Sequence, residues 1–233
     1  RDDALLVVHK PAGLLVHRSP IDRHETEFAL QHARALNGGE HVYPVHRLDR
    51  PTSGVLVFGR NAEVARDLGQ QLMAGTVAKT YVALVRGWPA EQGVIDHPLR
   101  EEPEDRRLKG MEQPVREALT RYRRLATTEL PVRVEGYPTS RYAVVELAPA
   151  TGRKHQLRRH MKHISHPIIG DANHGRGRHN RYFAERFGEG RLMLAATSIE
   201  FRHPLTKAPT RIESFLEQSF VRVLSIFPGF QWH

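Results

Sequence analysis

An aspartate flanked by two arginines is the first candidate for chemistry in this sequence. Asp49 lies between Arg47 and Arg50, is followed by Pro51, and precedes an apolar run at residues 55–58. Proline disfavours helical angles at the residue before it, and β-branched and aromatic residues favour a strand. The pattern predicts an acid on a loop at the start of a buried strand, where reactive groups are often presented. The alternative is a surface turn whose carboxylate only neutralises the two arginines.

The chemistry open to this acid is narrowed by its neighbours and by what the chain lacks. A carboxylate beside arginines is ionised at neutral pH, so it suits a nucleophile or a base better than an acid. A metal site is disfavoured, because His160, His163 and His166 drift around a helix at their spacing and no Asp or Glu lies within that segment. The glycine-rich loop of kinases and the Gly-x-Ser-x-Gly motif of serine hydrolases are missing.

The composition favours a polyanionic partner. The 233 residues carry a net charge of +9 with histidines neutral, and the pI is about 10.2. RNA, DNA and an anionic membrane surface are all compatible with this charge. The absence of cysteine excludes disulfides and thiolate chemistry and fits a reducing cytoplasm. No run of 18 apolar residues is present, so we expect a cytoplasmic protein with no membrane span and no signal peptide.

The first third of the chain predicts short elements around the acid. Residues 4–8 and 14–17 are apolar runs separated by a turn with Pro and Gly, which predicts a hairpin. Residues 26–36 place their apolar side chains on one helical face. Asn61 predicts the N-cap of a second helix, which Gly75 would end.

The middle of the chain predicts strands and one long excursion. Residues 77–86 predict a strand on which Tyr81 lies on a mostly apolar face, a position that is ordinarily core packing. Residues 99–115 are charged and broken by Pro and Gly, which indicates a surface excursion. Strands are expected again at residues 118–125 and 141–147.

Residues 151–164 predict a basic helix capped by Thr151. Apolar side chains recur on one face, so Arg158, Arg159 and Lys162 are expected to point outwards. A solvated surface is one interpretation of that face, and phosphate contact is the one that the high pI favours.

Arg153 and Lys154 would fall in the first turn of this helix. Cations there are disfavoured by about 0.3–1 kcal/mol, because the N-terminal end carries partial positive charge. A fixed anion would offset that cost. The anion could be a substrate phosphate or a protein carboxylate, and Asp49 is one candidate.

The last third predicts a sheet edge and a closing element. Residues 165–177 read as a loop, and residues 191–201 as a buried strand. Residues 203–209 look like a hairpin connection into a strand at 210–212. Residues 215–227 fit either a helix or a strand.

Four motifs, in one order, resemble the RluA-type pseudouridine synthases, which isomerise uridine to pseudouridine in RNA. The motifs cover nearly the whole chain and are His9-Lys10-Pro11-Ala12-Gly13-Leu14, His46-Arg47-Leu48-Asp49-Arg50-Pro51-Thr52-Ser53-Gly54, Lys79-Thr80-Tyr81-Val82-Ala83-Leu84-Val85 and Thr151-Gly152-Arg153-Lys154-His155-Gln156-Leu157-Arg158. Residues 15–19, Arg50-Pro51 and the run from Arg158 to Asp171 are most similar to the branch that modifies uridine 65 of tRNA.

The resemblance implies a role for each matched residue. Asp49 would be the essential catalytic carboxylate, attacking the flipped nucleotide or abstracting its proton. Arg47 would fill the space that the flipped base leaves, and Tyr81 would stack on the uracil. Arg153 would pair with Asp49, and Leu194 would pack against the base. Base flipping costs a few kcal/mol, which an inserted arginine and an aromatic platform can partly recover.

The resemblance also implies the fold and the partners. We expect an α+β chain whose residues 1–233 form a single catalytic domain, with a central mixed, mainly antiparallel sheet, a basic cleft and no N-terminal accessory RNA-binding domain. No metal or organic cofactor and no obligate protein partner are implied. The RNA, most simply tRNA, would be contacted along its backbone by the basic residues of one segment: Lys154, Arg158, Arg159 and Lys162.

Two positions depart from the family pattern. Ala195 stands where relatives commonly have a histidine, and His9 replaces a usual asparagine. Neither position is the proposed acid, the aromatic platform or the arginine pair. A ribosomal-RNA enzyme of the same family and a non-catalytic RNA-binding or RNA-folding protein remain alternatives, and a metal-dependent nuclease is a third.

Overall fold

The computed structural model describes residues 1–18, 24–102, 112–188 and 190–232. The chain divides into two compact units, each built from several segments. Unit 1 consists of Arg1–Lys79, Arg100–Val115 and Ala196–Phe215. Unit 2 consists of Thr80–Leu99, Arg116–Ala195 and Leu216–His233.

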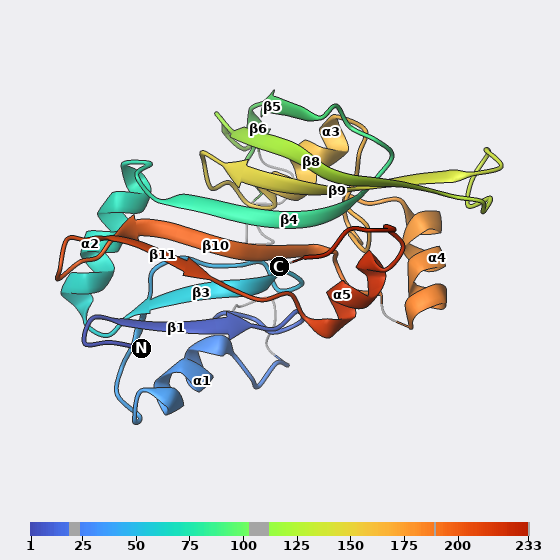
Figure 1. Cartoon of the computed structure of the whole chain (residues 1–233). Coiled ribbons are helices and arrows are strands. Elements are labelled where there is room, and N and C mark those ends of the chain that lie inside the picture. Colours follow the sequence, from blue (N-terminus) through green and yellow to red (C-terminus); the bar gives the residue numbers. More distant parts are fainter. Residues whose placement is uncertain (19–23, 103–111, 189, 233) are drawn as a thin grey trace. The chain divides into compact units, whose positions relative to one another are not determined.

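Unit 1 is a small β-sheet with two helices (Figure 1). β3 lies between β1 and β10, β2 also pairs with β3, and β11 pairs with β10. α1 contacts β1, and α2 contacts β3. The elements are β1 (Leu5–Lys10), α1 (Ala29–Leu36), β2 (Tyr43–Pro44), β3 (Ser53–Gly59), α2 (Ala62–Met73), β10 (Leu194–Arg202), whose first two residues belong to unit 2, and β11 (Pro209–Glu213).

β3 is the buried strand that the sequence predicts after Asp49, and all seven of its residues are buried. Its second residue must be a glycine. Gly54 has a φ of +119°, and a Cβ at this position would lie 2.0 Å from the carbonyl oxygen of Ala196 on β10. The glycine therefore lets two neighbouring strands approach closely, directly after the loop that carries the acid.

The helices of unit 1 begin and end as their sequences predict. The Asn61 side chain accepts a hydrogen bond of 2.9 Å from the Val64 amide and caps α2. Gly75 follows this helix with a φ of +70°. α1 lies within the predicted residues 26–36 and ends at Asn37.

The predicted hairpin of residues 4–8 and 14–17 is wrong. β1 pairs with β3 instead, with Leu5 opposite Gly59 and Lys10 opposite Gly54. Leu15 makes only a single parallel bridge, to Phe28. After β1 the chain turns and continues toward α1. The backbone hydrogen-bonding groups of β1 pair with β3, a strand some 45 residues later in sequence.

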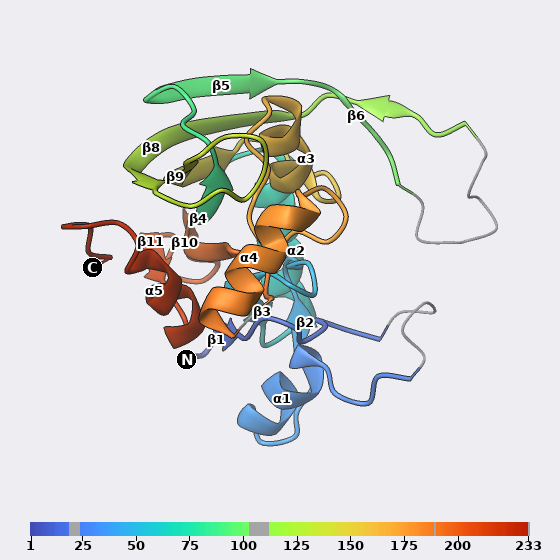
Figure 2. The ribbon, with the colours of Figure 1, turned by 90° about the vertical axis from the view of Figure 1, so that its right-hand side faces the viewer.

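Unit 2 is a four-stranded antiparallel sheet in the order β4-β9-β8-β5, with helices α3, α4 and α5 (Figure 2). The elements that lie wholly or mostly in it are β4 (Ala78–Arg86), β5 (Gln92–Asp96), β8 (Leu119–Leu130), β9 (Ser140–Pro149), α3 (Gln156–His163), α4 (Gly177–Phe187) and α5 (Gln218–Leu224). One boundary between the two units falls within β6 (Leu99–Arg100) and another within β7 (Val115–Arg116). These two strands pair with each other.

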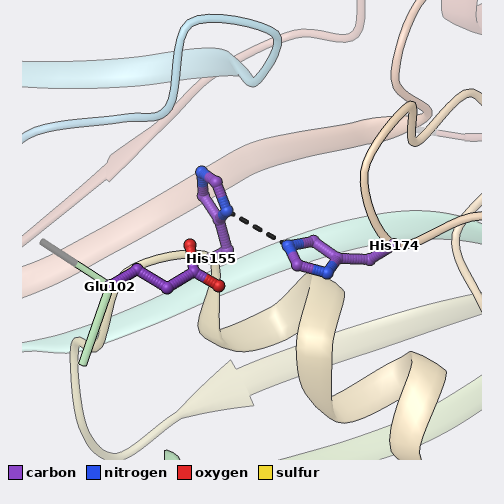
Figure 3. A group of neighbouring side chains, drawn as sticks. All are labelled: Glu102, His155 and His174. Carbon is purple, nitrogen blue, oxygen red and sulfur yellow. Dashed lines mark hydrogen bonds between the residues drawn. The ribbon is translucent and has the colours of Figure 1, made fainter. Parts of the chain in front are cut away.

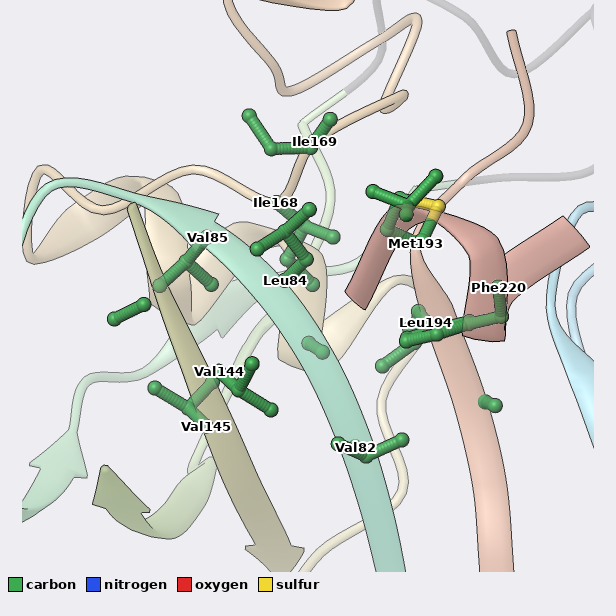
Figure 4. Close-up of a cluster of buried hydrophobic side chains, with 14 of the residues drawn as sticks. Val82, Leu84, Val85, Val144, Val145, Ile168, Ile169, Met193, Leu194 and Phe220 are labelled. Carbon is green, nitrogen blue, oxygen red and sulfur yellow. The ribbon is translucent and has the colours of Figure 1, made fainter. Parts of the chain in front are cut away.

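The core of unit 2 lies around β4 and β9. Val82 to Val85 and Tyr142 to Val145 are fully buried. Ile168, Ile169, Met193 and Phe220 pack on them from outside the sheet (Figure 4). Each large aliphatic side chain buried in this way contributes about 1.5–3 kcal/mol. These apolar contacts hold β4 in place, and β4 carries Tyr81.

The strands predicted at 77–86, 118–125, 141–147, 191–201 and 210–212 are confirmed. The predicted β10–β11 hairpin is also confirmed, since Ser198 lies opposite Glu213 and Arg202 opposite Pro209. The undecided segment 215–227 contains a helix, α5. Every pairing with a resolved register is antiparallel, which confirms the α+β expectation of a mainly antiparallel sheet. Much of the predicted excursion at 99–115 lies outside the described residues. Within the described ranges, no helix is long and apolar enough to cross a membrane.

Candidate active site

A fully buried lysine fixes the backbone beside Asp49 in unit 1. The Lys10 ammonium donates to the carbonyl oxygens of Pro11, Leu14 and Arg50 at 2.9, 2.7 and 3.0 Å. A buried charge is tolerated only when its hydrogen bonds are made, and here three carbonyls provide them. Lys10 therefore ties the residue next to the acid to the segment that follows β1.

Arg50 has a structural part in the same junction. Its carbonyl accepts from the Gly13 amide at 2.9 Å, and its Nε donates to the Gly13 carbonyl at 3.0 Å. Its Nη2 also donates to Glu25 at 2.6 Å. The Thr52 amide donates to the Asp49 carbonyl at 3.0 Å and closes the turn. These contacts hold the loop that carries Asp49 in place.

His46 supports the loop from the other side. The Val57 amide of β3 donates to His46 Nε2 at 3.2 Å, so this nitrogen acts as an acceptor and the ring is neutral. Burial, together with the positive charge of Lys79, lowers the pKa of His46 to about 4. Burial also lowers the pKa of Lys79 itself. The loop thus begins at a neutral histidine anchored to the strand that follows it.

The histidine makes the stability of the protein pH-dependent. An unfolded His46 takes up a proton near pH 6.5 and the folded one only near pH 4, so acid favours the unfolded chain. The stabilisation is complete above pH 6.5 and is lost as the pH falls toward 4. At about 1.4 kcal/mol per pKa unit, it amounts to about 3 kcal/mol. Urea unfolding at pH 7.0, 5.5 and 4.5 should give a flatter pH dependence for His46→Gln than for the wild type.

Other histidines with a lowered pKa, such as the partly exposed His97 and the buried His160, contribute to both proteins alike, so the difference between the two slopes isolates His46. Equal slopes would mean that His46 already titrates normally in the folded protein.

The remaining residues of the predicted site belong to unit 2. Tyr81 lies on β4 opposite Leu147 of β9, is partly exposed, and packs against the core of this unit. Leu194 is 3% exposed and belongs to that core. Arg153 is exposed, and its Nε donates to the Glu117 carbonyl at 3.0 Å. An aromatic ring and a guanidinium are therefore both presented from rigid backbone.

Gln156 holds the turn that presents Arg153. Its Oε1 accepts from the Arg153 amide at 2.9 Å and from the Thr151 hydroxyl at 2.7 Å. Its Nε2 donates to the Leu119 carbonyl at 3.0 Å and to Thr120 Oγ1 at 3.1 Å. The side chain is 4% exposed and uses both ends of its amide. The residues before the helix are therefore fixed to β8.

The start of this helix differs from the prediction. α3 begins at Gln156, and His155 precedes it with a left-handed φ of 54°. Thr151 is therefore not the N-cap, and Arg153 and Lys154 lie in the turn before the helix. The dipole penalty expected for them does not apply, because that field acts within the first helical turn.

The prediction that Arg158 points outwards to phosphate is also wrong. Its guanidinium is 4% exposed and makes two hydrogen bonds to the Asp171 carboxylate, Nε to Oδ2 at 2.7 Å and Nη2 to Oδ1 at 2.8 Å. Burial acts to raise the pKa of Asp171, but Arg158 and backbone amides of the 171–174 turn lower it overall. Arg158 is a structural residue that holds α3 to the segment after it.

The other basic residues are more accessible. Lys162 is exposed, and Lys154 and Arg159 are partly exposed. They remain predicted phosphate contacts.

The histidines of the metal hypothesis have separate partners. His160 Nδ1 lies 2.9 Å from Thr120 Oγ1 and its Nε2 lies 3.0 Å from the His97 carbonyl, while His163 stacks on the His97 ring. His166 Nδ1 lies 2.8 Å from a backbone carbonyl at the end of β4. His155 hydrogen-bonds to His174 at 3.1 Å (Figure 3). The side chains of His160, His163 and His166 therefore do not converge on one point.

The predicted site residues fall in two groups. Arg47 and Asp49 belong to unit 1, and Tyr81, Arg153 and Leu194 belong to unit 2. The pairing of Arg153 with Asp49 stays a prediction.

Sequence reasoning assigned no role to Lys10 or Gln156, although both lie in recognised motifs. The sequence feature that could have indicated a role for Lys10 is a lysine at the end of a mostly apolar strand, directly before Pro11.

A loop that presents a carboxylate, in a strongly basic α+β chain, has the features expected of an enzyme that acts on nucleic acid. A family model described as RNA pseudouridylate synthase matches residues 4–163. The chain belongs to this family, whose members are isomerases.

The tRNA pseudouridine synthase C of Vibrio cholerae is 48% identical over 97% of this chain and 93% of its own. That of Haemophilus ducreyi is 47% identical over 100% of this chain and 95% of its own. The solved structure of human RNA Pseudouridylate Synthase Domain Containing 4 superposes with a TM-score of 0.71 at 26% identity, covering 97% of this chain and 90% of that one. Human RNA Pseudouridylate Synthase Domain Containing 1 also gives 0.71, at 24% identity, over 97% and 85% of the chains, and supports the fold alone.

Proposed function

We propose that this protein is a tRNA pseudouridine synthase that isomerises one uridine, uridine 65, with Asp49 as its catalytic carboxylate. The observation that carries the proposal is near-complete coverage at 44–48% identity by relatives named tRNA pseudouridine synthase C. The resemblance of the motifs to the uridine-65 branch supports the choice of nucleotide. The net charge of +9 suits an RNA substrate. The activity would belong to the cytoplasm, with the chain acting as a single catalytic domain.

The reaction defines what the residues must do. The bond from C1′ of the ribose to N1 of uracil breaks, a bond from C1′ to C5 forms, the proton on C5 leaves, and N1 takes up a proton. Asp49 is suited to assist as nucleophile or base, because it is presented on a loop held by the buried Lys10 ammonium. Either role requires the base to leave its stack first.

The other roles follow from the family resemblance. Arg47 would take the place of the flipped base, and Tyr81 would stack on the uracil. Arg153 would form an ion pair with Asp49. Leu194 would pack against the base. The partial exposure of Tyr81 on a rigid strand and the exposed guanidinium of Arg153 support these assignments.

The direct test is to map pseudouridine in tRNA and ribosomal RNA after incubation with the purified protein. We expect one new pseudouridine, at position 65 of tRNA, and none in ribosomal RNA. A product only in ribosomal RNA would assign the protein to the ribosomal-RNA enzymes of the same family. No product in either RNA, with RNA binding intact, would favour a non-catalytic RNA-binding protein.

A further inference from the structure

Unit 2 contains a cavity of about 390 Å³ that none of the roles above uses. Its walls are the end of β4, the connection between β8 and β9, and the segment from residue 165 to α4. The long β8–β9 hairpin projects beyond the end of β4 (Figure 1). The volume lies in the range of small-molecule and nucleotide sites.

Two charged groups lie side by side in this cavity. Arg86 Nη2 donates to Glu135 Oε2 at 3.4 Å, and the two side chains are 28% and 24% exposed. Arg86 Nε donates to Nε2 of the buried His179 at 3.2 Å, and His179 Nδ1 lies 2.9 Å from the hydroxyl of Tyr142. Burial lowers the pKa of His179, so its ring is neutral and accepts from Arg86. The guanidinium is thereby held in one orientation.

Arg86 and Glu135 each have one polar atom that these contacts do not use. Among the described residues, Arg86 Nη1 has no protein acceptor and Glu135 Oε1 has no donor. The cavity thus offers a donor next to an acceptor, partly shielded from water. This pair complements the edge of guanine, which accepts at O6 and donates at N1 and N2. Partly desolvated polar groups of this kind select ligands that satisfy them.

The rim of the cavity carries an aromatic ring and a cation, two further groups that RNA recognition uses. Tyr137 is 76% exposed and lines the cavity, so its ring is available to stack on a base. The Arg141 guanidinium lies 4.5 Å from the centroid of the Trp88 ring, and its Nε lies 3.3 Å from the Glu129 carboxylate, so both contacts fix this cation at the same rim. A polar floor, an exposed aromatic ring and a cation together describe a site for an unpaired nucleotide.

We propose that this cavity binds an unpaired guanine of the substrate RNA, with Arg86 and Glu135 reading its edge and Tyr137 stacking on its face. The inference rests on the proposed function, which supplies RNA as the ligand. Within unit 2 the cavity is separate from Tyr81: Arg86 follows Tyr81 by five residues on β4, or about 16 Å along the strand. It would select the RNA while the other residues act on uridine.

Fluorescence anisotropy with two labelled hexanucleotides, UUGUUU and UUUUUU, tests the proposal. We expect the wild type to bind UUGUUU about tenfold more tightly, and Glu135→Gln to bring the ratio close to one. Tyr137→Ala should weaken the binding of UUGUUU about tenfold. This side chain is exposed, so the variant should fold even if Glu135→Gln does not. Phe215→Ala removes a 66% exposed ring from unit 1 and should bind as the wild type does.

Equal affinity of the wild type for both hexanucleotides would overturn the inference, as would wild-type behaviour of Tyr137→Ala. The result is independent of catalysis. A wild type that prefers UUGUUU but forms no pseudouridine would refute the proposed function and leave the guanine site in place, and the reverse pattern would refute the guanine site alone.

Discussion

Asp49→Asn is expected to abolish pseudouridine formation while leaving the affinity for tRNA within about threefold of the wild type. Asparagine has nearly the same shape but lacks the negative charge that a nucleophile or base requires, so the loss should be on the order of 10⁴-fold or more. Tritium released from tRNA containing 5-tritiated uridine measures the reaction, because the C5 proton is lost. Filter binding measures the affinity.

This substitution should separate catalysis from folding, because asparagine keeps the shape of the side chain. The contacts of Lys10, Gly13, Arg50 and Thr52 that hold the loop are also retained in the variant. Asp3→Asn provides a matched control, since Asp3 is a fully exposed carboxylate of the same unit and should retain full activity. Tritium release by Asp49→Asn at the wild-type rate would exclude this residue as the catalytic group.

Local features of the fold could be predicted because their causes are close in sequence. The loop before β3 follows from a proline and a glycine, the start of α2 from the Asn61 cap, and the β10–β11 hairpin from a single short connection. In each, the sequence signal is a cap, a turn or a connection of a few residues. Local propensity and backbone hydrogen bonding then agree on one structure.

Predictions failed where the partner lies far away in the chain. The strand after residue 4 was assigned to a neighbouring segment, but its hydrogen bonds go to β3. Arg158 was predicted to point outwards, toward phosphate, because a helical period places it opposite Leu157 and Met161. The buried carboxylate of Asp171, thirteen residues later, decides its orientation instead. Helical periodicity identifies faces but does not identify what packs against them.

The candidate site also has one part that the sequence indicates and one part that it does not. Asp49 and its arginines indicate a candidate acid, because residue type limits the chemistry, and the catalytic role of Asp49 stays a prediction. The support of Asp49 could not be predicted, because Lys10 donates to carbonyl oxygens, which every residue possesses and no sequence pattern marks. The pKa of His46 likewise depends on burial and on Lys79, 33 positions away.

Arg158→Met is expected to lower the free energy of unfolding by about 3–5 kcal/mol. Removing the guanidinium leaves the carboxylate of Asp171 buried, with 0% exposure and without its charged partner, and an uncompensated buried charge is costly. Backbone amides at Asn173 and His174 still donate to that carboxylate, so the protein should fold. Urea denaturation at pH 7 measures the change.

Lys162→Met separates this structural role from contact with RNA on the same helix. Lys162 is exposed, so its replacement should change the free energy of unfolding by less than about 0.5 kcal/mol. If Lys162 contacts a phosphate, its loss should weaken tRNA binding and reduce the salt dependence of binding by about one unit of slope. If Arg158→Met changes the free energy of unfolding as little as Lys162→Met does, the Arg158–Asp171 pair is solvated in solution. Arg158 would then again be a predicted RNA contact.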